Sequence, residues 1–132
     1  MGAAYYIVLD REIAGVDPFV NGKAVARESD RLEIVSQSIG LRDINEFVSA
    51  SPDDLMATAE ELGIELPNEP PPEVWFAPEE GLSWISQLQH HLTANPNAVG
   101  DADAVLADLA EYREVLDTAK ANDVRWHFAV DF

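Results

Sequence analysis

The closing stretch VRWHFAVDF holds the residues best suited to chemistry. Alternate side chains of a strand point to opposite faces, so Trp126 and Phe128 share one face. On that pattern Arg125, His127 and Asp131 share the other. We expect the two rings to be buried against helices and His127 to face solvent.

Asp10, at the end of the strand expected over residues 3–9, is placed to lie near this row. An imidazole beside a carboxylate is a general acid–base pair, so His127 with Asp131 or Asp10 is the weak catalytic candidate. Cross-strand ion pairing and partner contact through Arg125 fit the same row. The chain has no cysteine, no serine in a recognisable nucleophile elbow and no glycine-rich phosphate loop.

A basic stripe is the second candidate site. Lys23, Arg27 and Arg31 recur every four residues on a helix expected over residues 22–39, with Asn21 as its cap. They lie away from the apolar stripe of Val25, Leu32, Val35 and Ile39. Ile34 falls on the same outer side. Either acids elsewhere in the domain cover this stripe, or it binds a partner or an anion.

His90 and His91 are adjacent, and adjacent helical residues point about 100° apart. A chelating pair needs spacing of three or four residues on one face, so we expect no metal site. The sequence indicates no cofactor either.

Charge is the most unusual global feature. The chain carries 25 acidic and 8 basic residues, a formal net charge of −17. Such a field repels nucleic acid and anionic membranes, so we expect neither as a partner. It attracts a basic protein and speeds the encounter. The alternative is that the acids only keep the domain soluble.

Helical signals fill the middle of the chain. Asp43 and Glu46 have capping-box spacing for a short helix. Ser51 and Pro52 open the next helix, with Leu55, Ala59 and Leu62 expected on one face up to Gly63. A proline-rich connector then leads to Trp75, a candidate contact residue, in a short edge strand. Two long helices are expected over residues 78–94 and 101–122. The second carries an apolar stripe at helical spacing, formed by Val105, Leu109, Tyr112, Leu116 and Ala119. Gly40, followed by apolar Leu41, is expected to end the helix of residues 22–39 in a Schellman motif.

The order of elements predicts the architecture. Strands stand at the two ends of the 132 residues and helices lie between them. We therefore expect a single α+β domain over residues 1–132, dominated by helices. Its N- and C-terminal strands pair in a small sheet covered by about four helices. Exposed strand edges offer a route to a homodimer.

The location is expected to be cytoplasmic. The N-terminus lacks a basic region followed by a long apolar run, and no stretch approaches the ~20 apolar residues of a membrane span.

Three stretches together, FVNGKAVA, WFAPEEGL and RWHFAVDF, resemble a pattern found in small, acidic bacterial proteins of uncharacterised function. The resemblance covers most of the chain and implies no activity, cofactor or catalytic residue. In size and acidity the chain is also similar to bacterial immunity-type proteins, which neutralise toxins by binding them.

These observations favour a non-catalytic, immunity-type protein-binding domain that engages a basic partner through its acidic surface. The alternative is a small hydrolase-like enzyme that uses His127 with a nearby carboxylate. Mimicry of nucleic acid is a third hypothesis, which the irregular spacing of the acids disfavours.

Overall fold

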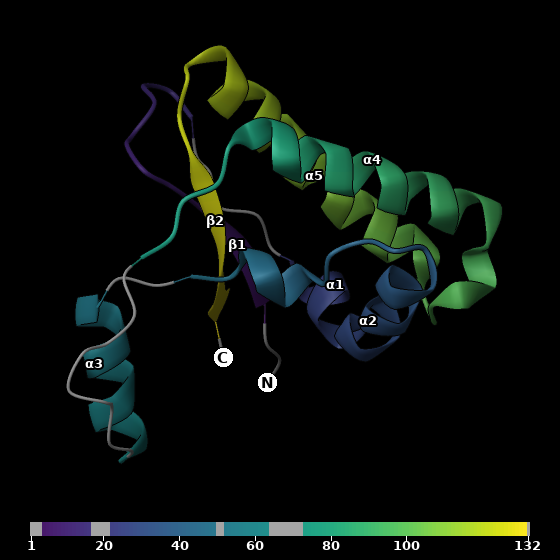
Figure 1. Ribbon diagram of the computed structural model, residues 1–132, viewed down its shortest axis with the longest axis horizontal. Coiled ribbons are helices and arrows are strands. Elements are labelled where there is room, and N and C mark those ends of the chain that lie inside the picture. Colours follow the sequence, from purple (N-terminus) through teal and green to yellow (C-terminus); the bar gives the residue numbers. More distant parts are fainter. Residues whose placement is uncertain (1–3, 17–21, 50–51, 64–72, 132) are drawn as a thin grey trace.

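The computed structural model describes residues 4–16, 22–49, 52–63 and 73–131. Within them the protein is α+β and mainly helical, as predicted (Figure 1). The terminal strands β1 (Ala4–Leu9) and β2 (Trp126–Asp131) form a two-stranded antiparallel sheet, with Ala4 opposite Asp131 and Leu9 opposite Trp126. The predicted pairing of the two ends of the chain is therefore confirmed.

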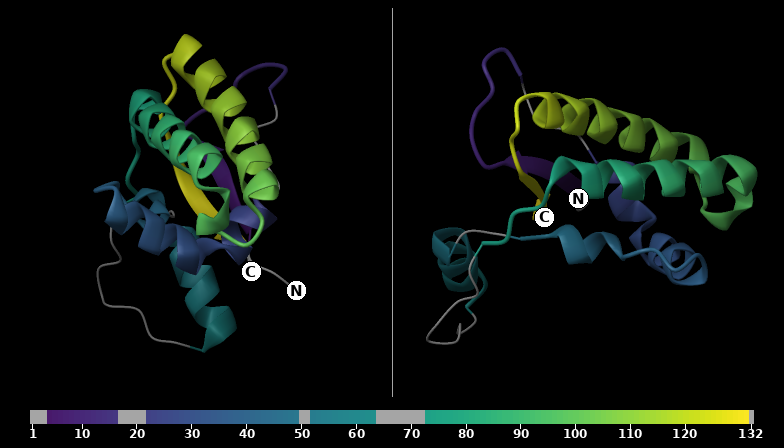
Figure 2. Two further views of the ribbon diagram at one scale, coloured as in Figure 1. Left: turned by 90° about the vertical axis from the view of Figure 1, so that its right-hand side faces the viewer. Right: turned by 45° about the horizontal axis from the view of Figure 1, so that its top comes forward.

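The connecting chain is helical. Its α-helices are α1 (Lys23–Arg27), α2 (Ser29–Ser38), α3 (Pro52–Leu62), α4 (Pro78–Ala94) and α5 (Ala102–Ala121), with 3₁₀ turns η1 (Ile44–Phe47) and η2 (Pro96–Ala98). Figure 2 shows α4 and α5 side by side as a layer over the sheet. In both figures α3 stands apart from that layer.

The helix predicted over residues 22–39 is two helices, which corrects that expectation. The chain turns at Glu28, whose carboxylate accepts the Asp101 backbone N–H at 2.9 Å. The Asp108 carboxylate on α5 accepts the N–H groups of Ala24 and Val25 at 3.1 and 3.2 Å, and so caps α1 from a distant helix. The predicted caps Asn21 and Ser51 lie outside the described residues.

The core is built on the predicted helical stripes. All five apolar residues predicted on α5 are fully buried: Val105, Leu109, Tyr112, Leu116 and Ala119. Two other assignments are wrong. Ile39 is 37% exposed, because α2 ends at Ser38 and the chain turns away at Gly40. Leu62 is 66% exposed, because it lies in the last turn of α3, the helix that stands apart.

Two predicted turn motifs are confirmed. Gly40 has a φ of 69°, a left-handed conformation that glycine adopts readily, and the Leu41 N–H donates to the Ser36 carbonyl at 2.8 Å, as in a Schellman motif. Asp43 and Glu46 form the predicted capping box, although the element they cap is the 3₁₀ turn η1.

The two faces of the sheet have different roles. Trp126 and Phe128 pair with Leu9 and Ile7 on the face that meets the helices, while His127 pairs with Val8 on the opposite face. At the far edge of β2, Phe76 and Trp126 exchange two backbone hydrogen bonds, of 2.8 and 3.0 Å. The edge strand expected at Trp75 is thus a single bridge at Phe76.

Candidate functional site

Trp126 and Phe128 are fully buried, as predicted, but the prediction that His127 faces solvent is wrong. His127 lies on the expected face of β2, opposite the two rings, yet only 1% of it is exposed. At His127 the polar row is therefore not an open surface, because other parts of the chain cover the imidazole.

The cover comes from the segment that precedes α4. The Trp75 ring lies over the imidazole, with 4.5 Å between centroids. Glu73 Oε2 is 2.7 Å from His127 Nε2, and the other ring nitrogen, Nδ1, is 2.9 Å from the Phe128 carbonyl oxygen. Each nitrogen thus faces an acceptor.

Backbone contacts hold this cover in place. Phe76 is bonded to Trp126, and the Val74 N–H donates to Ser49 Oγ at 2.8 Å. The Ser49 N–H in turn donates to the Phe128 carbonyl at 3.0 Å. Since successive side chains of an extended segment point to opposite sides, Trp75 covers the imidazole while Phe76 packs on the ring of Phe47 at 5.1 Å.

Neither Asp10 nor Asp131 is a strand neighbour of His127. Asp10 lies beyond the end of β1, where its Oδ1 accepts the Arg125 N–H at 3.3 Å and its own N–H donates to the Arg125 carbonyl at 3.0 Å. Asp131 is four residues along β2, about 13 Å away at the usual strand rise. The Arg125 residue is exposed.

Sequence reasoning missed Glu73 as the partner of His127. The two residues are 54 positions apart, and no periodic pattern connects them. The one available signal was alternation: if Phe76 returns to the core, Glu73 and Trp75 share the other side of the same extended segment.

The basic stripe is an exposed surface. Lys23, Arg27 and Arg31 are all exposed, and Ile34 is 67% exposed beside them. In the described part of the chain none of the three cations has an acidic partner within 4 Å, so the expected covering by acids is not seen there.

The charge of Arg27 affects the pKa of the Asp108 carboxyl. Burial raises the pKa of this carboxyl above its usual value. The hydrogen bonds from Val25 and Ala24, and then the charge of Arg27, oppose that rise in pKa. Asp108 therefore works as a partly buried cap for α1.

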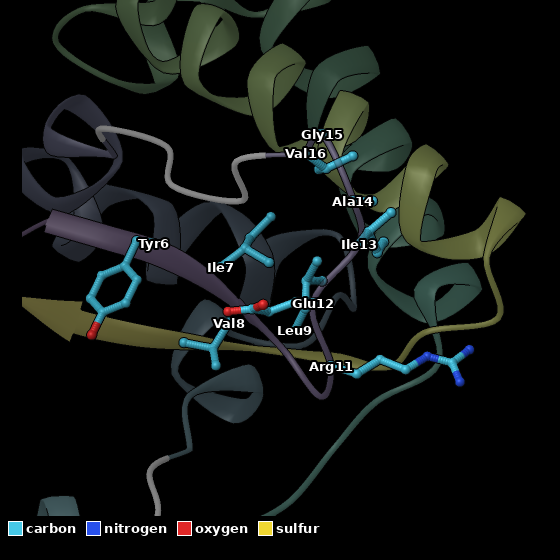
Figure 3. A pocket seen from close by; sticks show the side chains of 10 residues that line it. All are labelled: Tyr6, Ile7, Val8, Leu9, Arg11, Glu12, Ile13, Ala14, Gly15 and Val16. Carbon is cyan, nitrogen blue, oxygen red and sulfur yellow. The ribbon is translucent and has the colours of Figure 1, made fainter.

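A cavity of about 870 Å³ lies between β1 and the loop of residues 11–16 (Figure 3). Its lining is largely apolar, with Ile7, Leu9 and Ile13 among its walls. Arg11 extends away from it and donates to the Asn122 and Asp123 carbonyls at 2.7 and 3.1 Å. None of the predicted site residues lines this cavity.

The described residues contain no group of three or more His, Asp or Glu that could hold a metal ion. Nor does any helix among them have the length and apolar character to cross a membrane. No protein-family model, curated protein or solved structure matches this chain.

Proposed function

We propose that this protein is a non-catalytic binding domain of the immunity type, which acts in the bacterial cytoplasm and engages a basic protein through an acidic surface. The observation that carries the proposal is the uneven distribution of charge. Residues 43–112 hold 15 acidic residues and no Lys or Arg. Residues 1–42 hold six acids and five bases, and residues 113–132 hold four acids and three bases.

The acidic stretch includes η1, α3, α4 and the first half of α5. Its exposed acidic residues include Glu46, Glu60, Glu61, Glu79, Glu80, Asp101, Asp103 and Glu111. Among the described residues the ion pairs are Arg42–Glu80 at 3.7 Å and His127–Glu73 at 2.7 Å. Most of these carboxylates are therefore left to attract a cationic partner.

The enclosure of His127 also favours binding over catalysis. A general base must reach its substrate within hydrogen-bond distance, or through one water. Here the imidazole is covered by Trp75 and both its nitrogens already face acceptors. The hydrolase-like alternative has no comparable observation in its favour.

A capture experiment at low ionic strength, followed by kinetics with the purified partner, tests the proposal. We expect the chain to retain a basic protein whose association rate falls steeply with added salt, because electrostatic steering is screened. Failure to retain any basic protein would contradict the proposal.

Matched charge reversals locate the surface. Glu60→Lys with Glu61→Lys changes an exposed pair inside the acidic stretch, and Asp30→Lys with Glu33→Lys makes the same change in net charge on α2. The first pair should slow association more than the second. Equal effects would mean that only total charge matters.

A further inference from the structure

The chain leaves the neighbourhood of β2 at Ser49, forms α3, and returns at Glu73. We propose that His127 and Glu73 form a proton-operated clasp that fastens this returning end to the sheet. The clasp is closed while the pair holds a proton between His127 Nε2 and Glu73 Oε2, and it loosens when that proton is lost.

The count of hydrogens follows from the two contacts of the ring. The Phe128 carbonyl lies 2.9 Å from Nδ1 and the Glu73 carboxyl lies 2.7 Å from Nε2, so both contacts are hydrogen bonds only if each of them contains a hydrogen. A neutral imidazole has only one N–H. The contact between Nε2 and the Glu73 carboxyl at 2.7 Å therefore needs a second proton, held by the ring or by the carboxyl.

The surroundings offer no substitute for this proton. His127 is almost completely buried, so water cannot readily replace a lost bond. Val8 lies opposite it on β1, and Trp75 covers the ring. Among the described side chains, the other titratable or charged groups on this face of the sheet are the Tyr6 phenol and the exposed Arg125. Of the described groups, Glu73 is the one that bonds Nε2.

The direction of the pH effect is set by this geometry. When the pair loses this proton at higher pH, one ring nitrogen is left with a lone pair facing an acceptor: either Nε2 faces the Glu73 carboxylate at 2.7 Å, or Nδ1 faces the Phe128 carbonyl at 2.9 Å. Either contact is repulsive, so the imidazole should shift, and Glu73 and Trp75 should be held less firmly. The Phe76–Trp126 and Val74–Ser49 bonds, with the packing of Phe76 on Phe47, then hold the segment.

Opening of the clasp would act on α3, because one of the two chain segments that join α3 to the sheet returns at Glu73. Glu60 and Glu61 on α3 are exposed. The proton would thus control how firmly an acidic helix is held, whatever partner that helix meets.

NMR on the intact chain tests the clasp. In ¹⁵N-labelled histidine, the protonation of each His127 ring nitrogen is followed through a pH series. We expect protection of the Val74 and Phe76 amides against hydrogen exchange, corrected for intrinsic rates, to fall roughly tenfold or more as His127 deprotonates, the loss expected for a charge-assisted bond.

Glu73→Gln is the decisive variant, because removal of His127 itself risks misfolding. The glutamine NH₂ can donate to an unprotonated Nε2 while Nδ1–H still bonds the Phe128 carbonyl. We expect this variant to remain closed at high pH and to lose the pH dependence. His90→Gln, at an exposed histidine, should keep the wild-type response.

Two results would overturn the clasp. One is a His127 ring that loses its proton while Val74 and Phe76 keep their protection. The other is a Glu73→Gln variant with the full wild-type response to pH.

Discussion

Helix propensity and core packing predict opposite effects of Gly81→Ala on the free energy of unfolding. Gly81 lies in the first turns of α4, where alanine is the better helix former by about 1 kcal/mol. On that ground alone the variant should be more stable. However, a Cβ added at Gly81 would lie 2.3 Å from Trp126 Cζ2 and 2.7 Å from Leu116 Cδ1.

The indole cannot easily move to make room. Trp126 is fully buried, its Nε1 donates to the Ala77 carbonyl at 3.0 Å, and its ring stacks on Phe47 at 5.2 Å. Overpacking of a well-filled core costs about 1–3 kcal/mol, and a clash with a fixed ring belongs at the upper end. Subtracting the helical gain of about 1 kcal/mol leaves a net loss of about 2 kcal/mol in the free energy of unfolding.

Urea unfolding followed by tryptophan fluorescence measures this loss. With a slope of about 2 kcal/mol per molar, the midpoint of Gly81→Ala should fall by about 1 M. Ser86→Ala, at an exposed position of the same helix, is the matched control and should be neutral or slightly stabilising. A midpoint for Gly81→Ala at or above wild type would refute the packing explanation.

Substitutions at two further positions test polar contacts that are buried or partly buried. Tyr112→Phe removes the hydroxyl that donates to the Tyr5 carbonyl at 2.6 Å and should cost about 1–2 kcal/mol in urea unfolding. Burial raises the pKa of the Tyr112 phenol, so this group ionises in the unfolded chain first, and the stability of the wild type falls as the pH rises above about 10. Tyr112→Phe should lose less stability at alkaline pH. An unchanged slope of stability against pH would contradict this explanation. Asp108→Ala should cost about 1–2 kcal/mol, because α1 loses the acceptor for Ala24 and Val25. Asp108→Asn keeps an acceptor for these N–H groups. Because burial raises the pKa of Asp108 in the folded protein, the stability of the wild type should fall relative to this variant as the pH rises from about 4 through the raised pKa. Parallel profiles of stability against pH would contradict this prediction.

The sequence predicted the elements whose signals are local. The α5 stripe is visible because apolar residues recur at helical spacing, and all five are buried. Alternation along β2 correctly separated His127 from Trp126 and Phe128. Pairing of the terminal strands followed from the order of elements alone.

What the sequence could not show are contacts between distant segments. Alternation assigns His127 to a face but does not say what covers that face, and its cover arrives through a proline-rich connector without a periodic pattern. The break at Glu28 has a similar origin, because the partner of its carboxylate, Asp101, is 73 residues away. Local patterns fix side-chain direction, whereas burial depends on the whole chain.

The hydrogen bond between Val74 and Ser49 brings together two points that flank α3 in the sequence. A linker of a few residues would therefore suffice to span them. We therefore expect that another segment can replace α3 between these two points, provided that Glu73 keeps its contact with His127.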